Sequence, residues 1–123
     1  FDLYRIEQGK WLEKVLESEE CKTATYRIVV SHIPLTENSW HGGSHAWKHL
    51  AQRCEDKGFN IMLSGHLHKH RFYKEGTHNR TFPTLVIGAD KYTDIVANKE
   101  ALTIKLINKD GSLHKTYTYP AKK

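Results

Sequence analysis

The chain has 123 residues, of which 38% are hydrophobic and 27% are charged, a composition that is ordinary for a globular protein with one domain and a real core. Its apolar runs, such as residues 28–30, are far too short to cross a membrane, so we expect no membrane partner. The formal net charge of +5 suits an anionic partner. The basic residues are scattered, however, and are not interleaved with aromatic ones, so nucleic-acid binding is not the favoured function.

The first third of the sequence predicts a helix followed by a buried strand. Over residues 7–19 the apolar side chains form a stripe at helical spacing, made of Trp11, Leu12, Val15 and Leu16. Residues 17–24 are polar and predict a loop. Residues 26–31 form a continuous apolar run bounded by polar segments, which predicts a central strand buried on both faces. His32 follows this strand directly.

A second helix and a second strand are predicted next. Residues 36–43 predict a loop, after which Ser44 is a suitable N-cap. Apolar residues then recur at helical spacing, and Gly58 is placed to end the helix. Residues 60–64 form the second buried strand. Strand, helix and strand in this order predict a right-handed crossover and two parallel strands, so the segments that follow both strands should meet at one edge of the sheet.

The last part of the chain is rich in strand-like patterns. Runs at residues 81–88, 91–97, 101–108 and 112–119 predict antiparallel strands that extend the sheet system, and Asp110-Gly111 predicts a hairpin turn. Because no repeat or linker interrupts the pattern, residues 1–123 predict a single domain of the α/β class.

Two short motifs lie where the two predicted parallel strands end. Ser31-His32-Ile33-Pro34 follows the first strand, and Ser64-Gly65-His66-Leu67-His68 follows the second. Neutral imidazole is a common ligand for transition metals, and in an extended segment His66 and His68 would leave the chain on the same face. Simpler alternatives are a hydrogen-bonded strand-end histidine at residue 32 and an exposed turn at residues 66–68. We interpret His32, His66 and His68 as metal ligands because the sheet edge should bring them together.

These motifs resemble the last two metal-binding motifs of the calcineurin-like metallophosphoesterases. The resemblance extends to the helix with Gln8 and Trp11-Leu12-Glu13, and it covers residues 6–72. It implies the C-terminal half of a four-layer αββα sandwich, here a βαβ unit followed by antiparallel strands. It also implies hydrolysis of a phosphoester small molecule or nucleotide by two divalent ions (Mn, Fe or Zn). In that family precedent His32 and His66 bind one ion and His68 binds the other.

Three further motifs of that family, Asp-x-His, Gly-Asp and Gly-Asn-His, do not occur in this sequence. We therefore expect a C-terminal fragment of a longer metallophosphoesterase, with no catalytic residue besides metal ligands, at most partial metal occupancy and no activity of its own. Its partner would be the missing N-terminal half of the same protein. Half of a sandwich exposes a face that the other half would cover, so a homodimer through this face is a second expectation. The compartment stays open.

Other residues have structural explanations beside functional ones. His41 lies in the segment after the His32 motif, which lines the substrate pocket in the family that the sequence resembles, and is a candidate substrate contact. His45 and His49 are spaced to chelate a metal, but a polar helix face is the simpler interpretation. Trp11, Trp47 and Cys54 are predicted to lie in the core.

Two other functions stay open at this point. One is a non-catalytic metal-binding or scaffold module of the same fold, and the other is a basic nucleic-acid-binding domain.

Overall fold

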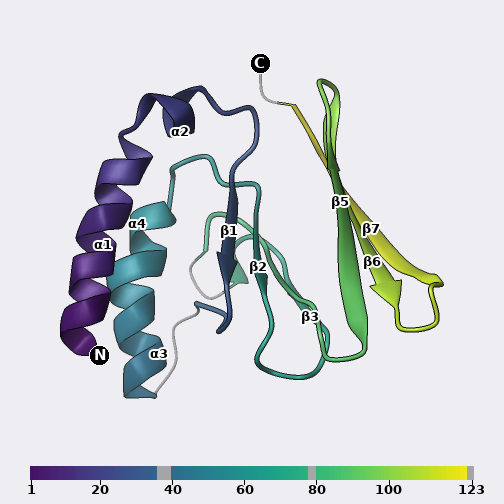
Figure 1. The fold of residues 1–123 in the computed structure, drawn as a ribbon, viewed down its shortest axis with the longest axis horizontal. Coiled ribbons are helices and arrows are strands. Elements are labelled where there is room, and N and C mark those ends of the chain that lie inside the picture. Colours follow the sequence, from purple (N-terminus) through teal and green to yellow (C-terminus); the bar gives the residue numbers. More distant parts are fainter. Residues whose placement is uncertain (36–39, 78–79, 122–123) are drawn as a thin grey trace.

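The structure is a computed structural model that describes residues 1–35, 40–77 and 80–121. It has three layers, formed by the helices, a four-stranded sheet and a three-stranded sheet (Figure 1). The helical elements are α1 (Asp2–Leu16), α2 (Glu19–Thr23), α3 (His41–Ala46), the π-helical turn η1 (Trp47–Ala51) and α4 (Gln52–Cys54). The strands are β1 (Ile28–Ser31), β2 (Ile61–Ser64), β3 (Arg71–Tyr73), β4 (Thr84–Val86), β5 (Lys91–Ala97), β6 (Ala101–Asn108) and β7 (Leu113–Pro120). No helix in these ranges has the length and apolar character needed to cross a membrane.

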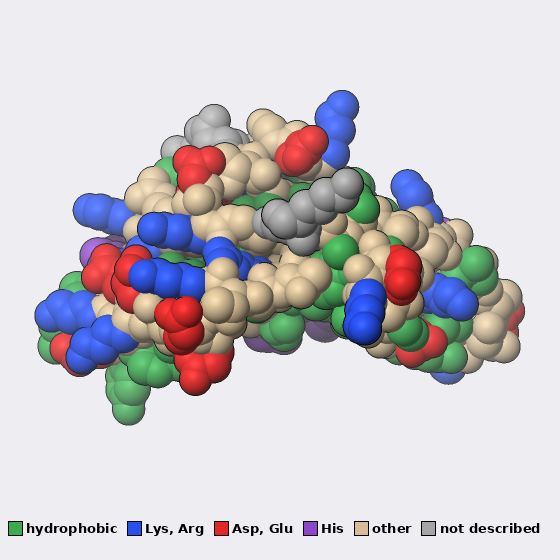
Figure 2. All heavy atoms as spheres, turned by 90° about the horizontal axis from the view of Figure 1, so that it is seen from above, with side chains coloured by type: hydrophobic (Ala, Val, Ile, Leu, Met, Phe, Trp, Pro, Cys, Tyr) green, Lys and Arg blue, Asp and Glu red, His purple; other side chains and the backbone are tan. Residues whose placement is uncertain are grey.

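Charged side chains of both signs are mixed on the surface. Figure 2 shows Lys and Arg side chains beside Asp and Glu side chains on the face seen from above. Several form exposed ion pairs, among them Lys22 with Glu17 at 3.1 Å and Arg53 with Glu13 at 2.8 Å. The side chains visible on this face form no stripe of one sign, of the kind that a nucleic-acid backbone would need.

The four-stranded sheet has the order β1-β2-β4-β3. Strand β1 lies at the edge of the sheet and its Val30 is 76% exposed, so the prediction of a central strand buried on both faces is wrong for β1. Strands β1 and β2 are parallel, as predicted for the βαβ unit. Strand β4 is also parallel to β2, so the prediction that residues 81–88 join an antiparallel run is wrong. All three residues of β4 are buried, and a strand buried on both faces carries no alternation that would reveal its neighbours. Strand β3, antiparallel to β4, was not predicted because three residues are too few to show a pattern.

The three-stranded sheet is an antiparallel meander of β5, β6 and β7. Strands β5 and β6 have the predicted bounds, and β7 is displaced by one residue at each end. The turn between β6 and β7 lies at the predicted Asp110-Gly111. The carboxylate of Asp110 accepts a hydrogen bond from the Ser112 amide at 2.9 Å, and Gly111 has a φ of +91°.

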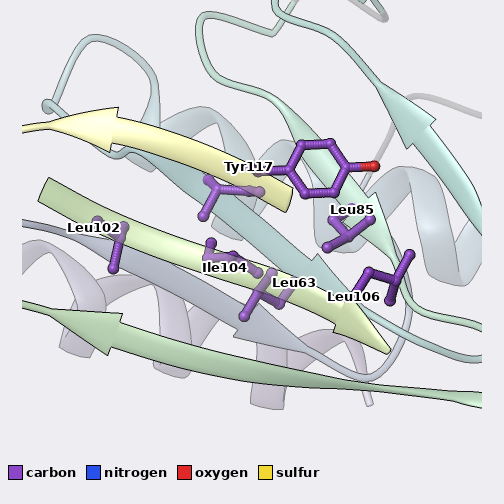
Figure 3. Packing of buried hydrophobic residues seen from close by; sticks show 7 residues of the cluster. Leu63, Leu85, Leu102, Ile104, Leu106 and Tyr117 are labelled. Carbon is purple, nitrogen blue, oxygen red and sulfur yellow. The ribbon is translucent and has the colours of Figure 1, made fainter. Parts of the chain in front are cut away.

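The main core lies between the two sheets (Figure 3). Alternate residues of β6 point into it, and Leu102, Ile104 and Leu106 are at most 1% exposed. Leu63 and Leu85 face them from the four-stranded sheet. At one end the ring of Tyr117 stacks on Phe72 at 4.7 Å between ring centroids. The period of two along β6 is therefore the sequence signal of a strand with one buried face.

A second core lies between the four-stranded sheet and the helices. Cys54 is buried there and Trp47 packs against it, as predicted. Trp11 is 59% exposed, so its predicted place in the core is wrong. Adjacent helix positions point about 100° apart, and here Leu12, not Trp11, is the one that reaches the core. Both cysteines are free.

The helix boundaries differ from those expected. Helix α1 begins at Asp2 instead of residue 7, and Asp2 pairs with Arg5 one turn later at 2.9 Å. Helix α2 occupies part of the predicted loop and begins after Ser18, whose hydroxyl accepts a hydrogen bond from the Cys21 amide. The second helical segment starts at residue 41 instead of Ser44 and ends at residue 54, ahead of Gly58. Residues 36–39 of the predicted loop lie outside the described residues.

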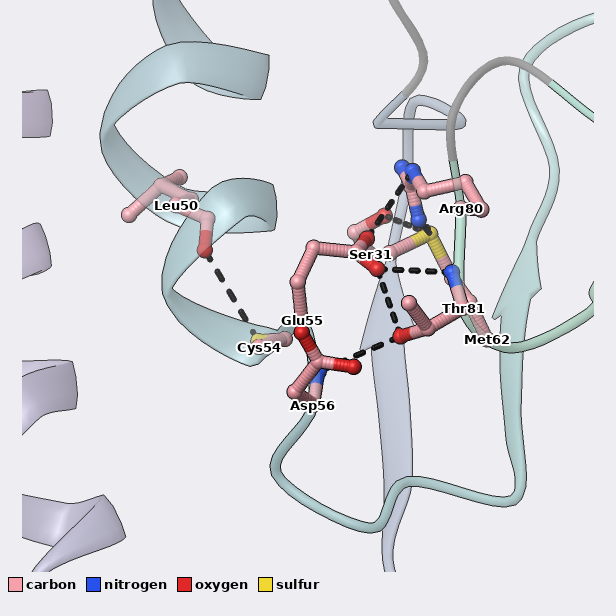
Figure 4. Close-up of polar contacts among 8 residues, drawn as sticks. All are labelled: Ser31, Leu50, Cys54, Glu55, Asp56, Met62, Arg80 and Thr81. Carbon is pink, nitrogen blue, oxygen red and sulfur yellow. Dashed lines mark hydrogen bonds and ion pairs between the residues drawn. The ribbon is translucent and has the colours of Figure 1, made fainter. Parts of the chain in front are cut away.

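A buried ion pair joins the end of α4 to the segment that enters β4 (Figure 4). Arg80 is 3% exposed, and its Nε lies 3.7 Å from Glu55 Oε1. The other oxygen of Glu55 accepts hydrogen bonds from the Thr81 amide and hydroxyl at 2.7 and 2.6 Å. The guanidinium also lies over the Phe82 ring, 5.4 Å from its centroid. A charge buried this deeply is tolerated only with such partners.

Gly88 allows the chain to pass close to the segment after the second histidine motif. It has a φ of +91°, and a Cβ there would lie 2.9 Å from the backbone nitrogen of His70. The neighbouring Val86 carbonyl lies 3.0 Å from His70 Nδ1. The end of β4 therefore supports residues 65–70 directly.

Burial of β6 can be tested with two isoleucines that face each other across the β5–β6 ladder. Ile104 is fully buried and its register partner Ile95 is 39% exposed. Replacing Ile104 by Ala should lower the free energy of unfolding by about 2–5 kcal/mol because it leaves a cavity. Ile95→Ala should cost about 1 kcal/mol or less. Urea unfolding of both variants measures this, and equal losses would show that the core does not lie where we place it.

The close approach at Gly88 can be tested against a second glycine with the same φ. A Cβ at Gly111 would meet nothing within 4 Å. Gly111→Ala should therefore cost only the strain of a left-handed alanine, about 1–2 kcal/mol. Gly88→Ala should cost at least about 1 kcal/mol more because of the clash, and it should shift the amide resonances of residues 65–70. Equal losses, with unmoved resonances, would contradict the contact.

Candidate metal centre

The site lies at the carboxyl edge of the parallel strands. Ser31 and Ser64, the last residues of β1 and β2, are register partners. The histidine motifs therefore leave the sheet at the same level. The Gly65 amide donates a hydrogen bond to the His32 carbonyl at 3.0 Å, which joins the two turns beyond the strand ends. Parallel pairing therefore brings the two histidine motifs together, as the sequence predicts.

His32 and His66 are in direct contact at this edge. Their ring atoms His66 Nδ1 and His32 Nε2 lie 3.2 Å apart, and the rings meet edge to face with centroids 5.1 Å apart. Two nitrogen ligands about 2.0–2.1 Å from one zinc ion lie roughly 3.0–3.4 Å apart, depending on the angle between them. The spacing of the two imidazoles therefore fits two neighbouring ligands of one ion, and both side chains belong to exposed residues.

The backbone of the second motif is not extended. The expectation that His66 and His68 leave an extended chain on the same face therefore does not apply. His66 has a φ of 66° and His68 a φ of 59°. The left-handed region costs a residue with a Cβ roughly 1–2 kcal/mol. The Leu67 amide closes the turn by donating to the Gly65 carbonyl at 2.7 Å. Two such residues in one turn are typical of segments whose geometry serves a function.

His68 is not part of the pair. It is exposed, two residues beyond His66. Among residues 1–35, 40–77 and 80–121, no group of three or more His, Cys, Asp or Glu side chains is arranged to hold a metal ion. The described residues therefore provide two converging donors, and an ion at this position would need its other ligands from elsewhere.

His41, the candidate substrate contact, lies at the start of α3 and faces α1. Its Nε2 is 3.0 and 3.1 Å from the two carboxylate oxygens of Asp2. This hydrogen bond is the main cause of the lowered pKa of Asp2. The contacts of His41 in the described structure are with the helices, and none joins it to His32 or His66. Its role toward a substrate stays a prediction.

His70 is a further histidine near this edge, where it contacts the end of β4. Because a carbonyl oxygen only accepts, His70 Nδ1 must donate to Val86, which leaves Nε2 with its lone pair in the neutral ring. The ring of His114, from the other sheet, meets it at 5.2 Å between centroids. The sequence signal for His70 was that histidine occurs at every second position, at residues 66, 68 and 70.

An apolar cleft lies away from the histidine pair. It has a volume of about 550 Å³ and lies between α1 and β1, where Trp11, Val15 and Val29 are among its lining residues. Neither His32 nor His66 lines it. Because the metal chemistry depends on the imidazoles, we place the candidate site at the sheet edge and not in the cleft.

Comparison with known proteins agrees with this architecture. The family model described as calcineurin-like phosphoesterase matches residues 2–70. A purple acid phosphatase from yellow lupin (Lupinus luteus) seeds superimposes with a TM-score of 0.69 at 16% identity, over 93% of this chain and 28% of the phosphatase. A predicted phosphoesterase from Streptococcus pneumoniae gives a TM-score of 0.41 at 15% identity, over 60% of this chain and 47% of its own. A search among curated proteins found no match.

The matched region contains both histidine motifs, β1, β2 and the helices that join them. The lupin enzyme shares the fold of nearly the whole chain, which spans little more than a quarter of that enzyme's length. The mixed α/β fold is thus that of part of a metallophosphoesterase. The chain belongs to the calcineurin-like phosphoesterase family.

Proposed function

We propose that this chain supplies part of the metal centre of a longer phosphoester hydrolase. The observation that supports this most directly is the 3.2 Å approach of His66 Nδ1 to His32 Nε2 at the carboxyl edge of two parallel strands. The family match provides the reaction class, which is hydrolysis of a phosphoester. The substrate would be a phosphorylated small molecule or a nucleotide.

In this proposal two divalent ions (Mn, Fe or Zn) supply an activated water and hold the phosphate oxygens. His32 and His66 would hold one ion. His68, whose backbone φ is 59°, would hold the second. None of the described side chains is assigned as an acid or a base, so the part of the chain described here orients ligands and does not itself transfer a proton.

The remaining ligands would come from an N-terminal part of the same protein. The open edge of the sandwich supports this. Val30 on β1 is 76% exposed although its register partner Leu63 on β2 is 5% exposed. On the other sheet Ile95 of β5 is 39% exposed although it pairs with the fully buried Ile104. Both sheets thus leave apolar side chains uncovered at their outer strands β1 and β5, where further strands or a second copy of the chain would fit.

A non-catalytic scaffold is the second candidate. A distance of 3.2 Å also suits a hydrogen bond from the N–H of one neutral imidazole to the lone pair of the other. In that case the pair would tie the two turns together without a metal. The two functions differ in what happens when a metal ion is added.

Metal binding by the histidine pair is the direct test. We expect weak, saturable binding of Zn²⁺ or Mn²⁺ to the chain in calorimetric titration, because the described residues supply only part of a ligand set. His32→Ala or His66→Ala should weaken it by more than the roughly 10–100-fold that loss of an outer partner costs. His114→Ala, which removes an imidazole from the other sheet, should leave the binding unchanged. The absence of binding that depends on His32 and His66 would leave the scaffold function.

The isolated chain should not turn over a phosphoester. With two described ligands and no assigned acid or base, it lacks the means to activate water. Release of aryl alcohol from an aryl phosphate with added Mn²⁺ measures this. Turnover above that of Mn²⁺ alone, abolished by His66→Ala, would show that the 123 residues form a complete active site and that our proposal of a partial one is wrong.

A further inference from the structure

A second group of titratable side chains lies between α1 and α3, apart from the histidine pair. His41, His45 and His49 follow one another at intervals of four residues. Their ring centroids are 5.5 Å apart for the first two rings and 4.3 Å apart for the last two. Asp2 of α1 faces them, with its carboxylate 3.0 Å from His41 Nε2 and 3.8 Å from His45 Nδ1. We call these four residues the histidine ladder.

The first histidine of the ladder is far more exposed than the second. The side chain of His41 is 73% exposed and that of His45 is 15% exposed. His45 Nδ1 is buried and has no hydrogen-bond partner among the described residues. His49 lies in η1, and a π-helical turn of this kind is rare and often marks a functional position.

Charged side chains lie on both sides of the ladder. On the side of α1, Asp2 is already bonded to Arg5 at 2.9 Å as well as to His41. On the side of η1 and α4, the neighbours of His49 are the cations Lys48 and Arg53. The guanidinium of Arg53 in turn bonds to the His49 carbonyl and, at 2.8 Å, to Glu13 of α1. The ring of His49 therefore has His45 and the two cations Lys48 and Arg53 as neighbours, with Asp2 as the opposing charge.

The surroundings of His49 determine how its contribution to stability depends on pH. Burial lowers the pKa of His49 from its ordinary value of 6.5, and the nearby His45, Lys48 and Arg53 lower it further against the smaller opposing effect of Asp2. The folded state thus binds its proton more weakly than the unfolded state. This contribution to stability is complete above about pH 6.5 and is lost as the pH falls below that value toward the folded-state pKa.

We propose that the histidine ladder is a pH-sensitive clamp that holds α1 on α3 near neutral pH and releases it on acidification. Helix α1 forms one wall of the apolar cleft over β1, and α1 and α3 lie side by side (Figure 1). Release of the clamp would therefore open the cleft and loosen the start of α3. The clamp needs neither a bound metal nor phosphoesterase activity, so its test is independent of the proposed function.

Hydrogen exchange of the complete chain tests the clamp. Amide protection should be measured at about pH 7.5 and about pH 5.5, on either side of the imidazole pKa of ~6.5, with correction for the pH dependence of intrinsic exchange. Protection of α1 should fall by up to roughly tenfold for each unit by which the pKa of His49 is lowered. Protection of β6 and β7 should change much less. Equal protection of α1 at both pH values would overturn the proposal.

Variants separate the clamp from a general loss of stability. His49→Gln removes the titrating ring, so the pH response of α1 should shrink, while His114→Gln removes a ring on the other sheet and should leave it intact. Asp2→Asn, at an exposed position, should loosen α1 already at about pH 7.5, where imidazoles are mostly neutral. A full pH response in His49→Gln would overturn the proposal, and so would unchanged protection in Asp2→Asn, which serves as the decisive variant if His49→Gln does not fold.

Discussion

The parallel pairing of β1 with β2 is the constraint on which the candidate metal centre depends. It sets Ser31 opposite Ser64, so each following turn starts from the same line at the sheet edge. A slip of one residue would reverse the faces of every side chain in the strand and would move Val29 and Met62 out of the core beneath the helices. The burial of that core therefore fixes the register, and the register brings His66 to within 3.2 Å of His32.

Two cores on opposite sides of the same sheet hold this arrangement in place. The helices cover one face, where Ala51 and Cys54 share a core with Met62 of β2, and the meander covers the other through β6. The sheet edge that carries the histidines is supported in turn by the end of β4, where the Ile87 amide donates to the Ser64 carbonyl at 2.8 Å. The second sheet thus contributes to the site indirectly, by holding the strands that end there.

The sequence predicted the parts of this fold in which local pattern and tertiary role agree. Strand β6 alternates apolar and polar residues because one of its faces is buried, and its bounds were predicted correctly. Strand β4 is buried on both faces, so its residues carried no sign of its parallel partner. The helix stripe wrongly placed Trp11 in the core. Periodicity shows which face of a helix is apolar, but not how far the neighbouring layer extends over that face.

The candidate site was likewise predicted only in part. The strand ends and the order strand, helix, strand were sufficient to predict that His32 and His66 meet. The position of His68 depends on the left-handed turn at residues 66–68. Histidine is enriched at positive φ, but such residues are too uncommon for the sequence alone to predict the turn. The contact of His41 with Asp2 joins two helices through side chains 39 residues apart, and the sequence contains no periodic signal for it.

At His66 and His68, the residues that would best suit the left-handed backbone are not those that carry an imidazole. Asparagine and glycine occupy this region more readily than histidine does, so either would relieve strain in the turn while removing an imidazole from the edge. A selection for thermal resistance alone would therefore favour variants that have lost the chemistry. Under the proposed function, histidine is kept at these two positions for its side chain, at the expense of backbone strain.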